Sequence, residues 1–194
     1  HQVPAVWDSA GYNIQAREFV DAFKAWRDRD SFLRLFRKAY KDALYKCELY
    51  PLFVSGIYLF LKPSSKEAFL FVRAAQAVLG TLSCLLLYLI AVKVFNRRVA
   101  LPSLLVAAFY IPFALSEGRL LTETLAIFIF LLTNWLLVLA LDRGSWWLIL
   151  LSGLVCALLV ITRTFFQYIY IFYFPILAVG LGVRKKWWHF PKSL

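Results

Sequence analysis

Residues 124–162 read TLAIFIFLLTNWLLVLALDRGSWWLILLSGLVCALLVIT, and this stretch decides the fold class. Its only charged residues, Asp142 and Arg143, divide it into two uncharged apolar segments, Thr124–Leu141 and Gly144–Thr162. Each segment has about the length that an α-helix needs to cross a ~30 Å hydrocarbon core at about 1.5 Å per residue. The link between them is so short that the two helices must run antiparallel. The stretch therefore predicts a transmembrane helical hairpin.

Three further uncharged stretches of similar length flank this hairpin: Ala74–Val92, Val99–Ser116 and Thr164–Val183. In lipid every backbone polar group must be satisfied internally, so each stretch is expected to be a helix. Together with the hairpin they predict five spans and an all-α, polytopic membrane protein. The apolar stretch Tyr50–Leu61 is below the ~17–25 residues that a span needs, so we expect a short interfacial or re-entrant helix there.

The composition of the 194-residue chain favours the same class. Hydrophobic residues make up 62% of it, whereas a soluble domain is about 45–50% apolar. The net charge of +11 raises nucleic-acid binding as an alternative. However, the excess lies in clusters at the ends of apolar stretches, Lys93, Arg97 and Arg98 and then 184–186. We therefore expect juxtamembrane charge and no nucleic-acid partner.

The cysteines and histidines predict neither a disulfide framework nor a metal site. Cys47, Cys84 and Cys156 lack CxxC spacing, and two of them lie in apolar stretches, where a free cysteine behaves as a small hydrophobe. His1 and His189 are far apart in the sequence. The sequence indicates no cofactor, and it leaves a divalent metal open.

Residues 8–28 have the pattern of an amphipathic helix, with apolar residues at helical spacing from Tyr12 onward. Asp8 or Ser9 is placed to cap the N-terminus of this helix. A second amphipathic helix is expected from about Ser31 to Leu49. Both have the shape of helices that lie in the membrane interface. The alternative is that they form a small soluble subdomain.

The chain divides into three predicted parts. Residues 1–66 form an outer-face first loop with amphipathic juxtamembrane helices, 67–186 a transmembrane helical bundle, and 187–194 a cytoplasmic tail. There is no Met at position 1, and the chain stops just beyond an apolar stretch. We therefore expect it to be a piece of a longer protein.

The charges of the short loops predict an orientation. Alternation of the spans places the cluster at 93–98, Arg143 and the cluster at 184–186 on one side, and only Arg119 and Arg163 in the opposite short loops. The positive-inside rule makes the first side cytoplasmic. The second side, with residues 1–73, then faces outward from the plasma membrane.

The ionisable residues at this outer boundary are functional candidates, because charge next to hydrocarbon is costly. They are Asp8, Arg73, Glu117, Arg119, Glu123 and Arg163. Each also has an ordinary explanation. Asp8 is explained as an N-cap, and Arg73 as a side chain that reaches lipid headgroups. Glu123 is explained by an i,i+4 pair with Arg119. Arg163 interrupts a long apolar region, and a tight turn would account for it.

Several segments, taken in order, carry a resemblance to a known family. Residues 8–16, DSAGYNIQA, are similar to its first-loop pattern D-x-x-x-Y-x-x-x-A, and 49–52, LYPL, to its P-L-Y-P-L entry into a juxtamembrane helix. Residues 73–76, RAAQ, and 95–100, FNRRVA, resemble R-x-x-x-x-L…L-F-G-R-R-x-A. Residues 121–124, LTET, and 153–163, GLVCALLVITR, resemble its T-E/D-x-L and G-L-x-x-G-L-x-x-L-T-K/R segments.

In this order the segments resemble the first half of the GT-C fold membrane glycosyltransferases that use polyprenyl- or dolichyl-phosphate sugars. This family 39-like group includes protein O-mannosyltransferases and lipid A aminoarabinose transferase. The resemblance implies that the chain moves a sugar from a polyprenyl-phosphate donor to a lipid, glycan or protein acceptor at the outer membrane face. It implies an inverting mechanism with Asp8 as the general base. Tyr12, Arg73, Glu123 and Arg163 are then substrate-binding residues, with Arg73 or Arg163 beside the donor phosphate.

The sequence departs from the family pattern in places, and two other classes of function stay open. Asp8-Ser9 stands where the protein mannosyltransferases carry an Asp-Glu pair, which argues against that subgroup. A secondary transporter would place its ionisable groups near the bilayer midplane, whereas here the charges gather at one face. A non-catalytic membrane scaffold is the other alternative.

Overall fold

The computed structural model describes residues 4–43, 49–60, 66–109, 122–163, 165, 166 and 168. All regular elements within these ranges are helices, which confirms the predicted all-α class. In chain order they are α1 (Pro4–Lys24), α2 (Arg29–Ala43), α3 (Leu49–Tyr58), α4 (Lys66–Val94), α5 (Arg97–Ala108), α7 (Glu123–Arg143) and α8 (Trp146–Thr162).

Two of the predicted spans are long and apolar enough to cross a membrane, Glu67–Val94 in α4 and Glu123–Arg143 in α7. Only 22% and 39% of their apolar windows are buried. A core helix of a soluble protein would be mostly covered, so this exposed apolar surface suits contact with lipid. α8 has 17 residues, the lower limit for a span. The end of the predicted span 99–116 and nearly all of 164–183 lie outside the described residues.

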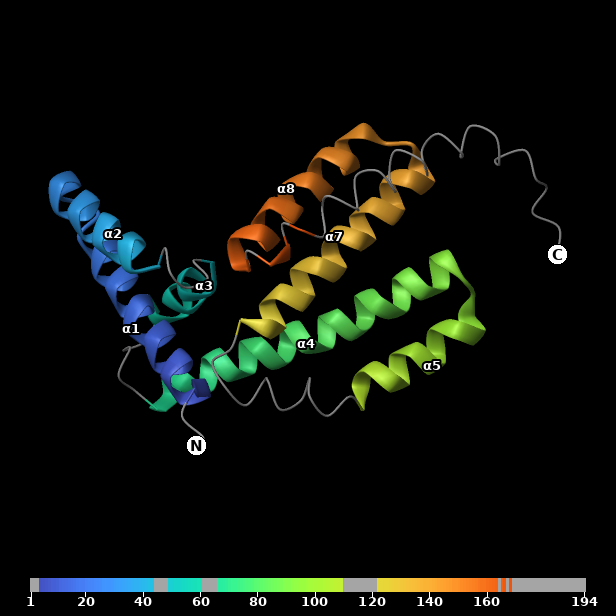
Figure 1. Ribbon diagram of the computed structural model, residues 1–194, viewed down its shortest axis with the longest axis horizontal. Coiled ribbons are helices and arrows are strands. Elements are labelled where there is room, and N and C mark those ends of the chain that lie inside the picture. The colour runs from blue at the N-terminus through green and yellow to red at the C-terminus, as the bar shows by residue number, and fades with distance from the viewer. Residues whose placement is uncertain are drawn as a thin grey trace.

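The long helices alternate in direction, as the short loops predict (Figure 1). The N-terminal ends of α4 and α7 and the C-terminal end of α8 lie next to α1–α3. The α4–α5 and α7–α8 connections lie at the opposite end of the bundle. There the Lys93 Nζ atom lies 2.7 Å from Asp142 Oδ2, so an ion pair joins the last turns of α4 and α7.

The α7–α8 hairpin is closed by Gly144, which has a φ of 64°. A residue with a side chain is strained in this left-handed conformation, so glycine favours the helix end here. Small side chains let the two helices approach closely; the buried ones include Ala126, Thr133 and Ala140 on α7 and Ser152 and Cys156 on α8. The Ser152 hydroxyl donates to the Thr133 carbonyl at 3.1 Å and fixes the register of the pair.

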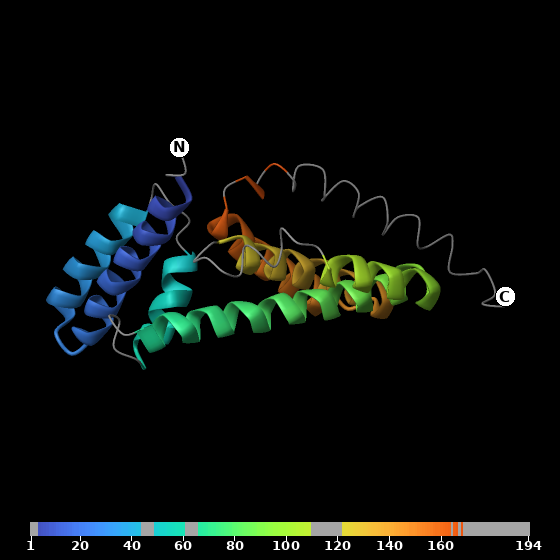
Figure 2. The ribbon, with the colours of Figure 1, turned by 90° about the horizontal axis from the view of Figure 1, so that it is seen from below.

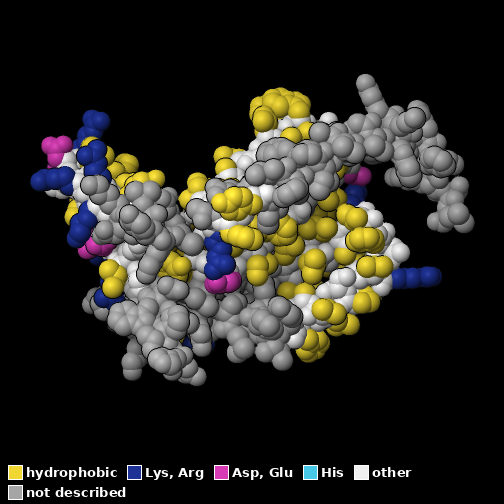
Figure 3. Space-filling model, viewed as in Figure 1, with side chains coloured by type: hydrophobic (Ala, Val, Ile, Leu, Met, Phe, Trp, Pro, Cys, Tyr) yellow, Lys and Arg dark blue, Asp and Glu magenta, His cyan; other side chains and the backbone are white. Residues whose placement is uncertain are grey.

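The helices α1 and α2 form an antiparallel pair across one end of the bundle, with α3 between this pair and α4 (Figure 2). Phe19 of α1 meets Phe36 of α2 edge to face, with ring centroids 5.5 Å apart. The apolar face of α1 is therefore covered by protein, while α2 leaves Leu33 and Tyr40 exposed. Charged side chains gather over this pair, and the visible described surface of the long helices is largely hydrophobic (Figure 3).

A buried cluster, here termed the junction core, joins the first three helices to the bundle. Its members are Tyr12, Ala16 and Val20 of α1, Tyr50, Val54 and Tyr58 of α3, Ala68 and Val72 of α4, Leu125, Ala126 and Ile129 of α7, and Leu159 of α8. Because the cluster draws on five helices, it fixes where the start of α7 and the end of α8 lie relative to α1 and α3.

The predicted starts and ends of the first helices need correction. α1 begins at Pro4, so Asp8 and Ser9 lie inside the helix and the capping interpretation is wrong. Proline suits a first helical position because its missing N–H would have no partner there. Leu49 begins α3 and does not end the second helix, and α2 is described only to Ala43. The short helix expected within 50–61 corresponds to α3.

Candidate functional site

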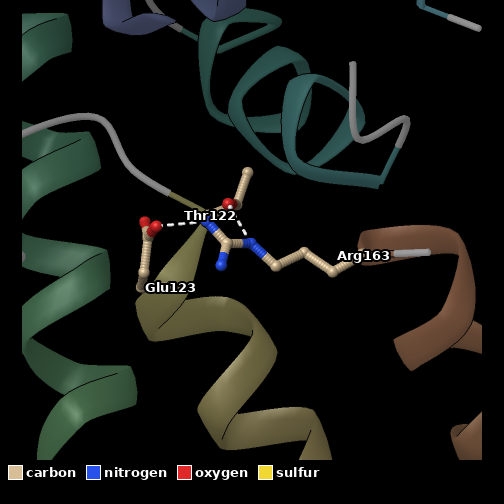
Figure 4. Close-up of polar contacts among 3 residues, drawn as sticks. All are labelled: Thr122, Glu123 and Arg163. Carbon is tan, nitrogen blue, oxygen red and sulfur yellow. Dashed lines mark hydrogen bonds and ion pairs between the residues drawn. The ribbon is translucent and has the colours of Figure 1, made fainter. Parts of the chain in front are cut away.

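The centre of the candidate site is an ion pair between the start of α7 and the end of α8 (Figure 4). Nη2 of Arg163 donates a hydrogen bond to Oε1 of Glu123. Nε of the same guanidinium donates to the Thr122 hydroxyl at 3.2 Å. Arg163 caps α8 in an extended conformation, with its backbone N–H bonded to the Leu159 carbonyl. The guanidinium is thus held by two adjacent residues, the N-cap Thr122 and the first residue of α7, Glu123.

The hairpin explains why these residues meet although they are forty positions apart. Glu123 and Arg163 lie twenty residues before and after Arg143, next to the turn. In an antiparallel pair such positions return to the same end of the two helices. Glu123 also lies in the first turn of α7, where the helix dipole favours a negative charge. The alternative partner, Arg119, lies outside the described residues.

The two oxygens of the Glu123 carboxylate have different surroundings. Oε1 accepts from Arg163, whereas Oε2 is buried and has no hydrogen-bond partner among the residues that the structure describes. The two side chains as a whole remain 36% and 41% exposed for Glu123 and Arg163. The pair therefore has one face toward the protein interior and one face that a ligand can reach.

Two tyrosines of the junction core line the protein side of this end. The rings of Tyr12 and Tyr50 meet edge to face at 75°, with centroids 5.3 Å apart. Tyr50 is fully buried, and its hydroxyl has no hydrogen-bond partner within the described ranges. Burial raises the pKa of Tyr50 far above its ordinary value, and the nearby Tyr58, Tyr12 and Glu123 add to the rise. The Glu123 charge thus lies close enough to act on the Tyr50 hydroxyl.

Asp8 lies on α1, one helical turn before Tyr12. Residues four apart lie on the same face of a helix, so the backbone places Asp8 on the side of α1 that carries Tyr12. The side chain of Asp8 is outside what the structure describes. Its assignment as the catalytic base therefore stays a prediction.

Arg73 lies in α4 and is exposed. Its guanidinium carbon is 5.9 Å from the centroid of the Phe69 ring, one turn earlier on the same helix. Its neighbours Val72 and Gln76 are buried, so Arg73 lies on a different face of α4 from the junction core. The described contacts bring together Glu123 and Arg163, and Tyr12 and Tyr50, while the role predicted for Arg73 stays untested.

Sequence reasoning did not single out Thr122 or Tyr50, although both belong to segments that carry the family resemblance. A usable signal existed for each. Tyr50, Val54 and Tyr58 share helical spacing, which predicts one buried face for α3. Thr122 directly precedes the acidic residue that begins an apolar stretch. Among the described residues, no group of three or more His, Cys, Asp or Glu side chains is placed to hold a metal.

Comparison with known proteins identifies one family. The family described as dolichyl-phosphate-mannose-protein mannosyltransferase matches residues 52–193. The match includes Arg73, Glu123 and Arg163, and it begins after Asp8, Tyr12 and the rest of α1 and α2. It therefore does not test the departure at Asp8-Ser9. The chain has no significant match among curated proteins or among solved structures.

Proposed function

Because the chain belongs to the dolichyl-phosphate-mannose-protein mannosyltransferase family, we propose that it transfers a sugar from a polyprenyl-phosphate donor to an acceptor at the outer membrane face. Membership of this family and the exposed apolar helices make it a polytopic membrane protein. The observation that carries the proposal is the Arg163 guanidinium, held by Glu123 and Thr122 where charge-free helices end.

This position suits recognition of a lipid phosphate. The polyprenyl chain would remain among the apolar helices, and its phosphate would lie at their ends, where Arg163 is. Arginine binds phosphate through strong charge-assisted hydrogen bonds. Two of the guanidinium nitrogens are already fixed by Glu123 and Thr122, so little rotational freedom would be lost when the phosphate binds.

The proposed reaction is a displacement at the anomeric carbon of the sugar. An acceptor hydroxyl oxygen forms a bond to this carbon, and the bond to the phosphate oxygen breaks. Polyprenyl phosphate leaves with the electron pair, and Arg163 stabilises the negative charge that develops on it. Asp8 accepts the proton of the acceptor hydroxyl as the general base. No step requires a further reactant.

Asp8 is supported for this role by its place on α1. It lies one turn from Tyr12, whose ring packs against Tyr50 in the junction core, and the Glu123 charge acts on Tyr50. The α1 face that carries Asp8 therefore belongs to the same end of the bundle as the Arg163–Glu123 pair.

The proposed orientation places this end of the bundle outside the plasma membrane. It is supported by the positive charges at the opposite end, where Lys93, Arg97, Arg98 and Arg143 lie. Reporter fusions after Asn96 and Asp142 are expected to read cytoplasmic, and fusions near Lys46 and Gly118 external. An external signal after Asp142 would overturn this orientation and the outer-face site.

The decisive experiment measures sugar transfer by the intact, reconstituted protein from a panel of polyprenyl-phosphate sugars. Arg163→Gln is compared with Arg143→Gln, a matched arginine at the opposite end of the same hairpin. Loss of charge-assisted hydrogen bonds should lower kcat/KM for the donor by about 10- to 100-fold in Arg163→Gln only. Failure of the wild-type protein to transfer any of these sugars, or equal effects of the two variants, would contradict the proposal.

A further inference from the structure

Two buried polar atoms near the candidate site lack a hydrogen-bond partner among the described residues, and their chemistry is complementary. The Tyr50 hydroxyl carries a proton to donate, whereas Oε2 of the Glu123 carboxylate can only accept. Burying either atom without a partner costs free energy, so such atoms in a folded protein need an explanation. The two atoms do not bond each other directly, but a water molecule that bridges them would explain both.

The fold brings these two groups to one place. Tyr50 on α3 belongs to the same buried cluster as Leu125 and Ala126, which follow Glu123 by less than one turn of α7. α3 passes beside Thr122 at the start of α7 (Figure 4). The Glu123 charge also contributes to the raised pKa of Tyr50. Helix packing therefore brings Tyr50 to the end of α7 at which Glu123 lies.

We propose that one bridging water molecule links the Tyr50 hydroxyl to Glu123 Oε2, the hydroxyl donating to the water and the water to the carboxylate, and so positions the carboxylate that holds Arg163. This inference rests on the proposed role of Arg163 in binding the donor phosphate. With Oε1 bonded to Arg163 and Oε2 to the bridging water, rotation of the carboxylate is restricted, and the guanidinium keeps its orientation. Tyr50 is thus a positioning residue, through which the packing of α3 in the junction core affects donor binding.

The test measures binding of a polyprenyl phosphate without sugar to the intact protein in detergent micelles. Tyr50→Phe removes the hydroxyl and keeps the ring that packs against Tyr12. We expect it to weaken binding by about 3- to 10-fold, as for the loss of one buried hydrogen bond. Tyr58→Phe is the matched control, because Tyr58 is a buried tyrosine of the same helix and cluster. It should bind the lipid phosphate like the wild type.

A double-mutant cycle shows whether Tyr50 acts through Glu123. Glu123→Gln alone should weaken binding, and adding Tyr50→Phe to it should weaken binding no further, because the hydrogen bond is already disturbed. Additive effects, or unchanged binding in Tyr50→Phe, would overturn the inference while leaving the function intact if Arg163→Gln still binds poorly. Unchanged binding in Arg163→Gln would instead contradict the proposed function.

Thermal stability without ligand gives a second, independent readout. If a water molecule bonds the Tyr50 hydroxyl to Glu123, Tyr50→Phe should lower Tm. If the hydroxyl has no partner, removing it relieves a buried unsatisfied group, so Tm should stay unchanged or rise. A rise or no change in Tm would overturn the inference whatever the binding data show.

Discussion

The two ends of the helical bundle each carry an ion pair between helices, and the pairs are equally exposed. Lys93 and Asp142 have side chains that are 40% and 37% exposed, and Arg163 and Glu123 have 41% and 36%. Exposure therefore does not distinguish a site from an ordinary surface pair. The difference lies in what surrounds each carboxylate.

At the Arg163 end, next to α1–α3, the pair is part of a larger polar group. Thr122 accepts a further hydrogen bond from the guanidinium, and the second Glu123 oxygen is buried. Lys93 and Asp142 lie in the last turns of α4 and α7, where the helix dipoles favour the lysine and oppose the aspartate. The Lys93–Asp142 pair joins two helix ends, while the Glu123–Arg163 pair holds one cation in a fixed orientation.

The largest expected effect tests whether α1 supplies the reactive group at the end of the bundle that carries Glu123 and Arg163. Asp8→Asn keeps the size of the side chain but cannot accept a proton, so sugar transfer should fall by on the order of 10²- to 10⁴-fold. Asp21→Asn, on the exposed side of α1, is the control and should transfer sugar normally. Near-normal turnover of Asp8→Asn, with membrane expression verified, would remove α1 from the catalytic machinery.

The comparison of the two ends is tested directly by neutralising one carboxylate at a time. Glu123→Gln should lower kcat/KM for the donor by about 10- to 100-fold, because the guanidinium loses its charged partner. Asp142→Asn should stay within about threefold of the wild type, since an exposed pair contributes little. Steady-state transfer assays at several donor concentrations give kcat/KM for each of the two variants. Equal losses at both ends would show that the pairs act only through general stability.

A change midway along the hairpin should alter stability at both ends. Ser152→Leu forces a large side chain against Thr133 in a closely packed interface, and should lower the free energy of unfolding by about 1–3 kcal/mol. Ser103→Leu is the control, because Ser103 borders an apolar groove of about 660 Å³ between α4, α5 and α7. Thermal unfolding in detergent should show a lower Tm for Ser152→Leu only. The same loss in both would argue against tight packing of α7 on α8.

The smallest expected effect is a pH dependence of the free energy of unfolding that Tyr50 causes. Tyr50 has a raised pKa in the folded protein because of its burial, whereas in the unfolded chain tyrosine ionises near pH 10. The unfolded state therefore releases a proton first, and the free energy of unfolding falls as pH rises above about 10, by at most about 1.4 kcal/mol per pH unit. Below that pH the contribution is constant. Tyr50→Phe should flatten this decline, and an unchanged decline would show that Tyr50 does not cause it.

Sequence periodicity and charge predicted much of the fold for clear physical reasons. Uncharged stretches such as Thr124–Leu141 have one stable form in lipid, and the short link at Asp142-Arg143 leaves one relative direction for the two helices. The starts of the first helices were harder to predict. Asp8 and Ser9 are good caps in isolation, but Pro4 begins α1 four residues earlier. Local capping preference did not decide that boundary.

The candidate site was predictable residue by residue but not as an arrangement. Glu123 and Arg163 were each singled out as boundary charges, yet the nearer Arg119 was weighed as the partner of Glu123. Their pairing requires the register of α7 on α8, which depends on Ser152 and Thr133 in the middle of the hairpin. Tyr50 could not be linked to Glu123 from spacing, because its place depends on packing among five helices.

The two helices of the hairpin have matching lengths, and the pairing of Glu123 with Arg163 depends on that match. Inserting one residue anywhere between Glu123 and Gly144 would turn the start of α7 by about 100° and shift it by about 1.5 Å relative to α8. Arg163 would then face a different side of α7, although every residue of the site is still present. We therefore expect length changes in α7 or α8 to abolish the pairing even when they lie a full membrane thickness away from it, on the far side of the bilayer.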